Sequence, residues 1–346
     1  MNKPIGVGLI GYGMAGRVFH APLIAAVPGL ELTAIVQRSG DSARERYPAA
    51  SIVRDVDALL ADDRISLVVV ATPTSSHHDL AARALEAGRH VVVDKPFTVT
   101  SEEGRELIEL AGKKKRVLSV FHNRRWDADF LTVQRMLSGD ALPLGRLVSF
   151  ESRFDRYRNA PRPSAWREST QPGSGVLYDL GSHLIDQALV LFGVPDRVVA
   201  SVRRERDFGE SDDAFDLWLE YSGFRATLHA GMLVRERTPR FVVRGTEATF
   251  IKNGLDPQEE ALAAGHSPSE SGWGGEARER WGTMMTDEGE FEIESLPGDY
   301  RAFYANVRDA INGEAQLIVT AEQAMAVVEI IESAHGECEG SKAPSS

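Results

Sequence analysis

Hydrophobic residues follow two different patterns along the chain. From residue 5 to about residue 122, short uninterrupted apolar runs alternate with stretches in which apolar residues recur every three or four positions. Uninterrupted runs are typical of strands buried in a parallel sheet, and the wider spacing is typical of amphipathic helices. The alternation predicts an α/β fold, a doubly wound parallel sheet with right-handed crossovers. The expected strands are Ile5–Ile10, Leu30–Val36, Leu67–Ala71, His90–Asp94 and Val117–Phe121.

After about residue 123 the pattern changes to longer segments in which apolar and polar residues alternate. The run D-A-F-D-L-W-L-E-Y, residues 213–221, is the clearest example. Strict alternation is expected of a half-buried antiparallel strand. One clear helix is expected among these strands, over residues 176–192. This part of the chain therefore predicts an α+β domain with a large, mostly antiparallel sheet. Its other expected strands are residues 144–154, 197–206, 225–233 and 240–245.

The first expected strand runs directly into a glycine-rich turn and then into an Ala-rich helical pattern. Strand, turn and helix in this order form the context in which G-x-G-x-x-G binds a dinucleotide. Gly11 permits the tight turn, Gly13 lets the backbone approach a pyrophosphate, and Gly16 lets the helix pack close to the strand. The free N–H groups near Met14 and Ala15 then face the phosphates. The turn consists of Gly11, Tyr12, Gly13, Met14, Ala15 and Gly16.

The second expected strand indicates which dinucleotide binds. A dinucleotide fingerprint normally ends this strand with Asp or Glu, which binds the ribose hydroxyls of NAD. Here the strand ends in Gln37, Arg38 and Ser39. The missing acid removes a repulsion against a 2′-phosphate, with which Arg38 can pair bidentately, and Ser39 adds a short donor. The pattern favours NADP; NAD is the alternative if Arg38 is an ordinary solvated surface arginine.

Five residues with distinct chemistry come directly after strand ends. Because ligands bind at the carboxyl ends of parallel strands, these residues are expected to converge on one crevice. They are Gly11, Arg38, Thr72, Lys95 and Asn123.

Two histidines lie close to the third strand end. Pro73 and Thr74 are expected to line the cofactor, with His77 capping or orienting it. His77 and His78 are adjacent, and neighbours in a helix do not share a face, so no metal site is expected from them.

Three further groups could do chemistry. Lys95, held at a strand end before a proline, could bridge cofactor and substrate; its alternative is an ordinary surface lysine. Asp179 and His183 are four residues apart on one expected helix face, so the carboxylate can fix the tautomer of the imidazole. Their alternative is a capping aspartate and a structural histidine. Asn123 could approach the nicotinamide and Arg124 a polyhydroxylated substrate, unless Arg124 only supports the backbone.

Composition narrows the class of protein. The chain of 346 residues carries 39 Lys and Arg against 51 Asp and Glu, a formal charge of −12. An acidic balance argues against nucleic acid or an anionic membrane as the main partner. The single cysteine, Cys338, excludes an internal disulfide and fits a reducing compartment. No signal-peptide pattern precedes the first strand and the apolar runs are short, so a cytoplasmic location is expected.

Taken together, these motifs resemble the glucose–fructose oxidoreductase/inositol dehydrogenase family over almost the whole chain. The resemblance is carried by the glycine turn, Thr72-Pro73-Thr74 with His77, Asp94-Lys95-Pro96 and Asp179-x-x-x-His183. Residues 91–100 and 121–127 are similar to the subgroup containing NADP-dependent scyllo-inositol dehydrogenases. The family motif usually reads Glu-Lys-Pro, so Asp94, which the resemblance places at the cofactor, is a departure with a shorter carboxylate that we expect to be tolerated.

The resemblance implies a role for each site residue in hydride transfer between NADP and a secondary alcohol of a cyclic polyol or sugar. Lys95 would polarise the substrate hydroxyl, and His183 would act as base in oxidation and acid in reduction. Asp179 would orient substrate or His183, and Arg124 would contact substrate. Trp166 and Arg167 would approach the nicotinamide, with Tyr157 on the substrate side.

The patterns and the resemblance together divide the chain. A dinucleotide-binding domain is expected at 1–122 and a substrate-binding and oligomerisation domain at 123–335, whose open-faced sheet would form a dimer or tetramer. Residues 253–281, rich in Gly, Glu and Ser, are expected as a long excursion or lid, and residues 336–346 as a disordered tail.

Three functions remain open from the sequence. The first is an oxidoreductase acting on an inositol-like polyol. The second keeps the chemistry but changes the substrate to an aldose, an anhydro sugar or a small keto compound. The third, from another class, is a non-catalytic NADP-binding sensor or regulator, which would have no need to keep Lys95, Asp179 and His183 together.

Overall fold

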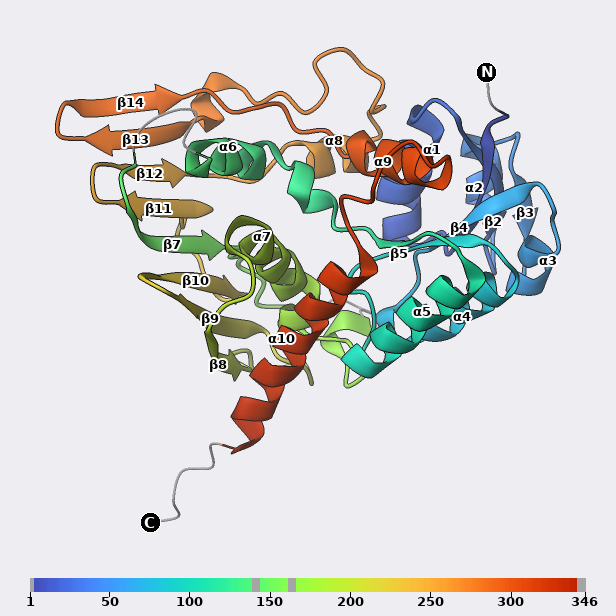
Figure 1. Ribbon diagram of the computed structural model, residues 1–346, viewed down its shortest axis with the longest axis horizontal. Helices are drawn as coiled ribbons and strands as arrows, with labels where there is room; N and C mark the ends of the chain where they lie inside the picture. Colours follow the sequence, from blue (N-terminus) through green and yellow to red (C-terminus); the bar gives the residue numbers. More distant parts are fainter. Residues whose placement is uncertain (1–2, 139–143, 161–165, 341–346) are drawn as a thin grey trace. The chain divides into compact units, whose positions relative to one another are not determined.

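The computed structural model describes residues 3–138, 144–160 and 166–340. It forms two compact units, and each unit is assembled from several segments of the chain (Figure 1). The first unit contains the chain up to Trp126, Pro257–Trp273 and Asp299–Met325. The second contains Asp127–Asp256, Gly274–Gly298 and the chain from Ala326 on.

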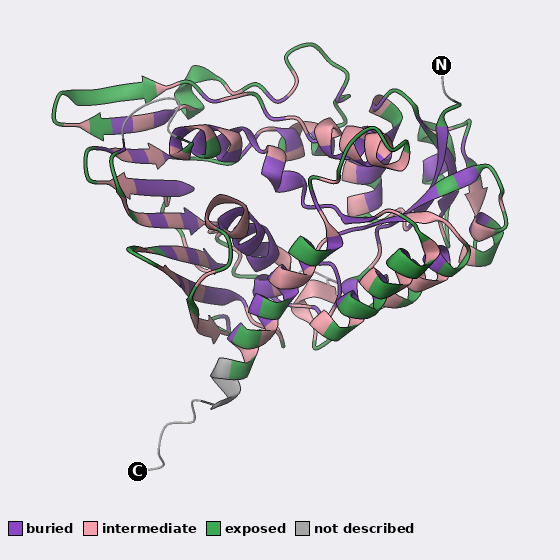
Figure 2. Cartoon of the chain, in the orientation of Figure 1, coloured by how far each residue is buried: buried purple, intermediate pink, exposed green. Residues whose placement is uncertain are grey.

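The first unit is built on a six-stranded parallel sheet. Its strand order is β3-β2-β1-β4-β5-β6, so the chain starts in the middle and winds outward in both directions. This doubly wound sheet confirms the expected fold of the N-terminal half. Figure 2 shows its central strands almost wholly buried, as uninterrupted apolar runs require. The strands are β1 Ile5–Ile10, β2 Leu30–Val36, β3 Ser51–Val53, β4 Ile65–Val70, β5 His90–Val93 and β6 Leu118–Val120.

Helices pack against both faces of this sheet. A capping box begins α5, where Glu103 N donates to Thr100 Oγ1 at 3.2 Å. The core also includes Tyr300, which precedes α9, and Phe303 and Tyr304 of α9, which cluster with the side chains of β1. The helices of this unit are α1 Ala21–Ala26, α2 Ser42–Arg46, α3 Val56–Leu60, α4 His77–Glu86, α5 Ser101–Lys114, α8 Gln258–Ala264 and α9 Arg301–Ile311.

The second unit is built on an eight-stranded sheet in the order β14-β13-β12-β11-β7-β10-β9-β8. All neighbours are antiparallel except β7 and β10, which confirms the mostly antiparallel sheet. The strands are β7 Leu147–Arg153, β8 Arg197–Arg203, β9 Ala214–Tyr221, β10 Phe224–Gly231, β11 Phe241–Gly245, β12 Thr249–Lys252, β13 Gly282–Thr286 and β14 Gly289–Ile293.

Alternation along these strands separates the two faces of the sheet. Phe215, Leu217 and Leu219 of β9 point into a core shared with α6 Ala128–Leu137, α7 Ser182–Phe192 and α10 Ala321–Gly340. Their neighbours on the same strand, among them Asp216, lie on the opposite, polar face.

Several parts of the structure differ from the sequence expectation. The first change between units comes after Trp126, not after residue 122, and two later segments return to the first unit. Part of the expected excursion is ordered: α8 lies within it, and Gln258 Oε1 accepts hydrogen bonds from Trp273 Nε1 and Tyr300 N. Helix α10 continues to Gly340, so the first five residues of the expected tail, 336–340, are helical. Residues 341–346 lie outside the described part of the chain.

Four elements of the second unit were not expected. They are α6, β12, β13 and β14. Strand β14 shows why: it alternates Glu290, Phe291, Glu292 and Ile293, but four of its five residues are exposed, so the alternation marks no buried face.

Candidate active site

The glycine turn after β1 satisfies three separate steric requirements. Gly11 has φ of +101°, and a Cβ there would lie 2.4 Å from the carbonyl oxygen of Ala71. A Cβ on Gly16 would lie 2.0 Å from the carbonyl oxygen of Gly11. Gly13 is exposed, and a Cβ on it would meet no atom within 4 Å. The turn therefore has open space at Gly13, where a pyrophosphate would approach, and fits a dinucleotide.

All five residues expected after strand ends lie at one edge of the first sheet, because β1, β2, β4, β5 and β6 are parallel. This edge is the carboxyl end of the strands, where ligands bind in open α/β sheets. Between β1 and β4 the winding direction reverses, which places the glycine turn at the switch point of the fold.

The loop after β2 is held in shape by its neighbours. Gln37 Nε2 donates to Ser39 O at 2.9 Å, and Arg54 Nη1 donates to Gln37 O at 2.9 Å. Arg38 and Ser39 are exposed. Within the part of the chain that the structure describes, Arg38 has no ion-pair partner, so its guanidinium is available for an anion.

His77 links two of the strand-end loops. Its Nε2 lies 2.9 Å from Thr72 O and its Nδ1 lies 2.9 Å from Pro96 O. Burial lowers the pKa of this imidazole, and the side chain is almost inaccessible. These contacts hold the Thr72 loop beside the loop that follows Lys95, so His77 orients the protein's own loops.

Lys95 follows β5 and its main chain is tied to the preceding residue. Lys95 N donates to Asp94 Oδ1 at 2.9 Å, and Asp94 N continues the sheet by donating to Val70 O at 2.8 Å. The Asp94 carboxylate is buried, and its other contact is His20, whose Nε2 lies 3.6 Å from Asp94 Oδ1. Sequence reasoning missed His20; its only signal is a histidine within the apolar helical pattern after the glycine turn.

The residues after β6 are largely buried. Asn123 and Arg124 are each 5% exposed. Arg124 pairs with Glu259 of α8, a partner that sequence reasoning also missed. Arg125 instead supports the backbone, because its Nη1 donates to Ile318 O at 2.8 Å. The structure thus separates the two arginines: Arg124 faces a carboxylate and Arg125 holds a loop.

In the second unit, Asp179 and His183 lie on either side of the junction between a π-helical turn, Leu177–Gly181, and α7. Asp179 Oδ1 accepts from Arg167 Nε at 3.1 Å. The Arg167 guanidinium lies 4.5 Å from the centre of the Trp166 ring. Asp179, Arg167 and Trp166 line one pocket together with Glu168, Arg206 and Asp212.

Tyr157 lies in a different local environment from that of Asp179. It is 39% exposed, pairs with Leu233 in an isolated β-bridge, and carries the Arg235 guanidinium 3.8 Å above its ring. Among the described residues that line the Asp179 pocket, Tyr157 does not appear.

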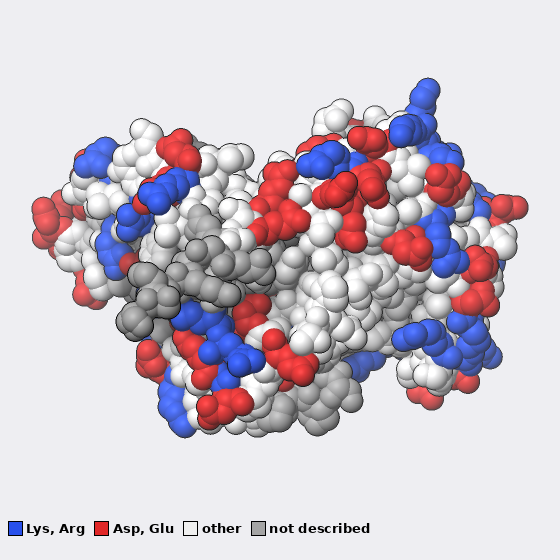
Figure 3. All heavy atoms as spheres, turned by 90° about the horizontal axis from the view of Figure 1, so that it is seen from below, with Lys and Arg blue, Asp and Glu red and all other residues white. Residues whose placement is uncertain are grey.

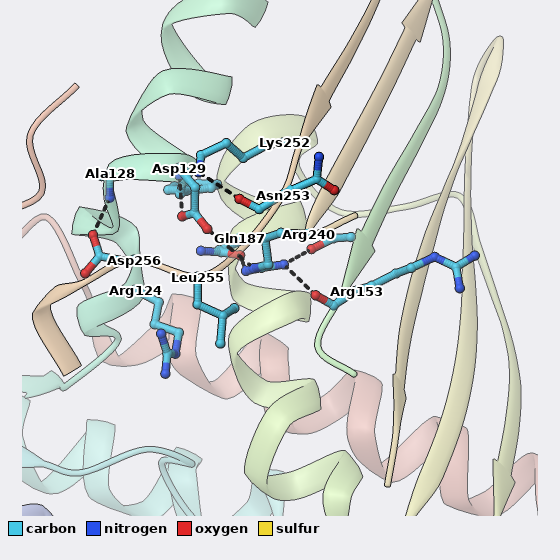
Figure 4. A network of polar contacts seen from close by, with 12 residues as sticks. Arg124, Ala128, Asp129, Arg153, Gln187, Arg240, Lys252, Asn253, Leu255 and Asp256 are labelled. Atoms are coloured by element: carbon cyan, nitrogen blue, oxygen red, sulfur yellow. Dashed lines mark hydrogen bonds and ion pairs between the residues drawn. The ribbon is translucent and has the colours of Figure 1, made fainter. Parts of the chain in front are cut away.

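A buried polar network anchors the helix that carries His183 (Figure 4). Arg240 Nη2 donates to Gln187 Oε1 at 2.7 Å, one helical turn after His183. Arg240 Nη1 also donates to Ser152 Oγ, and Asp129 Oδ2 lies 3.6 Å from Arg240 Nε. Since Ser152 belongs to β7 and Asp129 to α6, the network fixes α7 against both elements.

Two features of the described residues bear on other classes of function. None of the helices described is long and apolar enough to cross a membrane. The described His, Cys, Asp and Glu residues form no group of three or more that could hold a metal ion. Figure 3 shows acidic and basic side chains interspersed over the face that it draws.

The parallel sheet with its glycine turn at the switch point defines a dinucleotide-binding fold. Two family models match the chain: "Oxidoreductase family, NAD-binding Rossmann fold" over residues 5–122 and "Oxidoreductase family, C-terminal alpha/beta domain" over residues 141–344. The chain belongs to this family, the Gfo/Idh/MocA oxidoreductases.

Similar proteins cover nearly the whole chain. The uncharacterised oxidoreductase YdgJ of Escherichia coli is 45% identical over 96% of both chains. The NADP-dependent scyllo-inositol 2-dehydrogenase IolW of Bacillus subtilis is 39% identical over 95% of this chain and 92% of its own. The solved structure of yvaA from Bacillus subtilis has a TM-score of 0.93 at 37% identity and covers 98% of this chain and 97% of its own. The protein is therefore an NAD(P)-dependent oxidoreductase for a small molecule.

Proposed function

We propose that this protein transfers a hydride between NADP and a secondary alcohol carbon of a cyclic polyol or sugar, with scyllo-inositol as the model substrate. The observation that carries the proposal is Lys95 at the carboxyl edge of the sheet that bears the glycine turn. The choice of polyol and of NADP is supported by the similarity to a scyllo-inositol dehydrogenase that uses NADP.

The chemistry requires the substrate hydroxyl to lose its proton as the hydride leaves the carbon. His183 takes that proton in oxidation and returns it in reduction, because imidazole titrates near neutral pH. The Lys95 ammonium stabilises the charge that develops on the oxygen. Asp179, paired with Arg167, orients the substrate or His183. The nicotinamide, when bound, accepts or supplies the hydride.

The test measures initial rates of nicotinamide reduction across inositols, aldoses and anhydro sugars, with NADP and NAD in parallel. In Lys95→Ala and His183→Ala we expect kcat to fall by at least about 100-fold, because each group acts in the transition state. The affinity for NADPH should change by less than about 3-fold, since neither group supplies the phosphate contacts. Lys113→Ala, at an exposed lysine of α5, is the matched control.

Unchanged turnover in both variants would contradict the proposed roles. Turnover with an aldose or an anhydro sugar but no inositol would keep the reaction and change the substrate. Tight NADPH binding without turnover of any compound would favour the sensor over the enzyme.

The choice of NADP has a test of its own at Arg38. Arg38→Asp replaces a guanidinium that can pair with the 2′-phosphate by a carboxylate that repels it. We expect NADPH affinity to fall by about 10-fold to 100-fold, while NADH affinity changes little. Titration of both cofactors by fluorescence measures the ratio. Equal NADPH affinity in the variant would mean that Arg38 does not bind the phosphate.

A further inference from the structure

Three buried polar side chains from distant parts of the sequence meet inside the first unit, next to Lys95. His20 is the last residue of the π-helical turn Gly16–His20, Asp94 follows β5, and Tyr304 belongs to α9. His20 and Tyr304 are completely buried, and Asp94 is 7% exposed. Buried polar groups are retained where they hydrogen-bond, so the arrangement of these three decides what they can do.

The contacts connect Tyr304 to His20, His20 to Asp94, and Asp94 to the main chain of Lys95, a series that we call the line to Lys95. The Tyr304 hydroxyl lies 2.6 Å from His20 Nδ1, and His20 Nε2 lies 3.6 Å from Asp94 Oδ1. The same oxygen, Asp94 Oδ1, accepts the hydrogen bond from Lys95 N at 2.9 Å. When the Tyr304 hydroxyl donates to Nδ1, the imidazole proton lies on Nε2 and faces the carboxylate. The line therefore ends on the main chain of Lys95.

Electrostatics define the protonation states along this line. Burial alone would raise the pKa of the Asp94 carboxyl, but His20, Lys95 and His77 together hold it below its usual value. Burial raises the pKa of Tyr304 well above that of a free tyrosine. Asp94 is thus ionised and Tyr304 keeps its proton. The groups that face Asp94 come from four elements: His20 before α1, His77 of α4, Tyr304 of α9 and Lys95 after β5.

Aromatic rings fix the imidazole in place. The ring of His20 lies 4.4 Å from the ring centre of Phe121, and the ring of Tyr304 lies 5.7 Å from it. Phe303 also packs edge-on against Phe121, with the two ring centres 5.0 Å apart. A closely packed imidazole has little freedom to turn away from Asp94.

We propose that His20 and Tyr304 are positioning residues for hydride transfer, which act through the Asp94 carboxylate to hold the main chain of Lys95 at the end of β5. The inference rests on the proposed function, in which Lys95 polarises the substrate oxygen. In this role the Asp94 carboxylate contacts His20 and the Lys95 main chain inside the protein, and these contacts do not require a bound cofactor.

Two variants of different severity test this inference. Tyr304→Phe removes one hydroxyl and keeps the ring, and His20→Asn removes the group that faces Asp94. Ser119→Ala is the control, because Ser119 Oγ donates a buried hydrogen bond to Val319 O at 2.8 Å in the same unit. Tyr304→Phe and Ser119→Ala each lose one buried hydrogen bond, and His20→Asn loses the contacts with both Tyr304 and Asp94. Only Tyr304→Phe and His20→Asn lie on the line to Lys95.

Two readouts separate positioning from stability. We expect kcat to fall about 10-fold in Tyr304→Phe and about 100-fold in His20→Asn, with KM less affected. The reason is that a small displacement of a reacting group lowers the reaction rate strongly. The acid limb of the pH profile should move to higher pH in His20→Asn, because a buried carboxylate without its donor binds a proton more readily. The second readout is the ¹⁵N signal of the Lys95 amide in lysine-labelled protein, assigned by its loss in Lys95→Arg. This signal should shift in both variants.

The outcomes distinguish the two proposals. If both variants match Ser119→Ala in kcat, pH profile and Lys95 amide signal, the positioning role is wrong. If the wild-type protein turns over no substrate, the proposed function fails, and the Lys95 amide signal alone decides whether His20 and Tyr304 hold this main chain. If His20→Asn does not fold, the isosteric Tyr304→Phe decides the question by the same measurements.

Discussion

At the scale of single residues, the glycine turn separates the requirements of folding from those of binding. Gly11 and Gly16 are required by the protein itself, because a Cβ at either would overlap a backbone carbonyl. Gly13 faces open space, and nothing in the described chain would meet a side chain there. The described chain therefore does not itself require glycine at this position, which fits the proposed approach of a pyrophosphate.

This difference predicts opposite behaviour for two alanine variants. Gly13→Ala should leave the melting temperature within about 2 °C of wild type, because surface substitutions away from strained features have small effects. It should weaken NADPH binding by about 10-fold or more, since the methyl group occupies the approach of the pyrophosphate. Gly16→Ala should lower the melting temperature by at least about 4 °C, because overpacking against a backbone carbonyl costs about 1–3 kcal/mol.

Thermal unfolding and cofactor titration on the same samples check the pair. Full NADPH affinity in Gly13→Ala would show that no phosphate approaches this turn. A melting temperature of Gly16→Ala equal to that of wild type would show that the helix can move away from β1 without loss.

Site residues could be predicted from the sequence where their position depends on neighbours that are close along the chain. The glycine turn and Lys95 follow strand ends, and apolar runs make strand ends visible. His20 could not be assigned a role, because its partner Tyr304 lies 284 residues away. The pairing of Arg124 with Glu259 was hidden for the same reason, since the two residues are 135 positions apart.

At the scale of elements, two of the helices that begin near candidate site residues start with a π-helical turn. These turns are Gly16–His20, before α1, and Leu177–Gly181, before α7. A π-helical turn is wider than an α-helical turn and is frequent at functional sites. The first turn places His20 next to Asp94, and the second carries Asp179. Apolar spacing predicted both helices but could not show the wider turn, because the two periods differ by less than one residue.

The polar face of the second sheet carries a strong charge cluster. His229 of β10 lies between two carboxylates, with Nδ1 2.7 Å from Asp216 and Nε2 3.1 Å from Asp155. Asp216 also pairs with Arg203 of β8 at 2.7 Å. The hydrogen bonds that the His229 imidazole donates to Asp155 and Asp216 raise the pKa of His229 to about 9, despite its partial burial.

The raised pKa of His229 predicts how stability depends on pH. The folded protein binds this proton more tightly than the unfolded chain, whose histidine has a pKa near 6.5. The resulting stabilisation is fully present below about pH 6.5 and is lost as the pH rises through about 9. His229→Gln should therefore lower the melting temperature most near pH 6.5 and least above pH 9, as measured by scanning calorimetry.

His266→Gln provides the control. His266 pairs with Glu270 in the exposed loop that follows α8, and exposed ion pairs contribute little to the stability of the folded protein. Its melting temperature should follow that of wild type across the same pH range. A constant difference between His229→Gln and wild type at every pH would mean that the charge on His229 does not stabilise the sheet.

At the scale of the whole molecule, the class of fold was visible in the sequence but the grouping of segments was not. Two hydrophobic periods revealed a parallel sheet followed by a mostly antiparallel one. The boundary between units is set by which core each segment joins. Helix α9 lies far along the chain, yet Tyr300, Phe303 and Tyr304 pack with the strands of the first sheet. Its amphipathic pattern shows that it has a buried face but not which core that face enters.

The position of α9 far along the chain affects how the first unit folds during translation. Once the first 126 residues have emerged from the ribosome, every strand of the parallel sheet has been synthesised, together with the glycine turn and Lys95. The core of that sheet still lacks the α9 side chains, and His20 still lacks Tyr304. Domains generally fold as units in the order of their synthesis. Here the unit that begins first cannot be completed until α9 has been made, so part of the core of the nascent sheet stays uncovered while residues 127–256 and 274–298 of the second unit are translated.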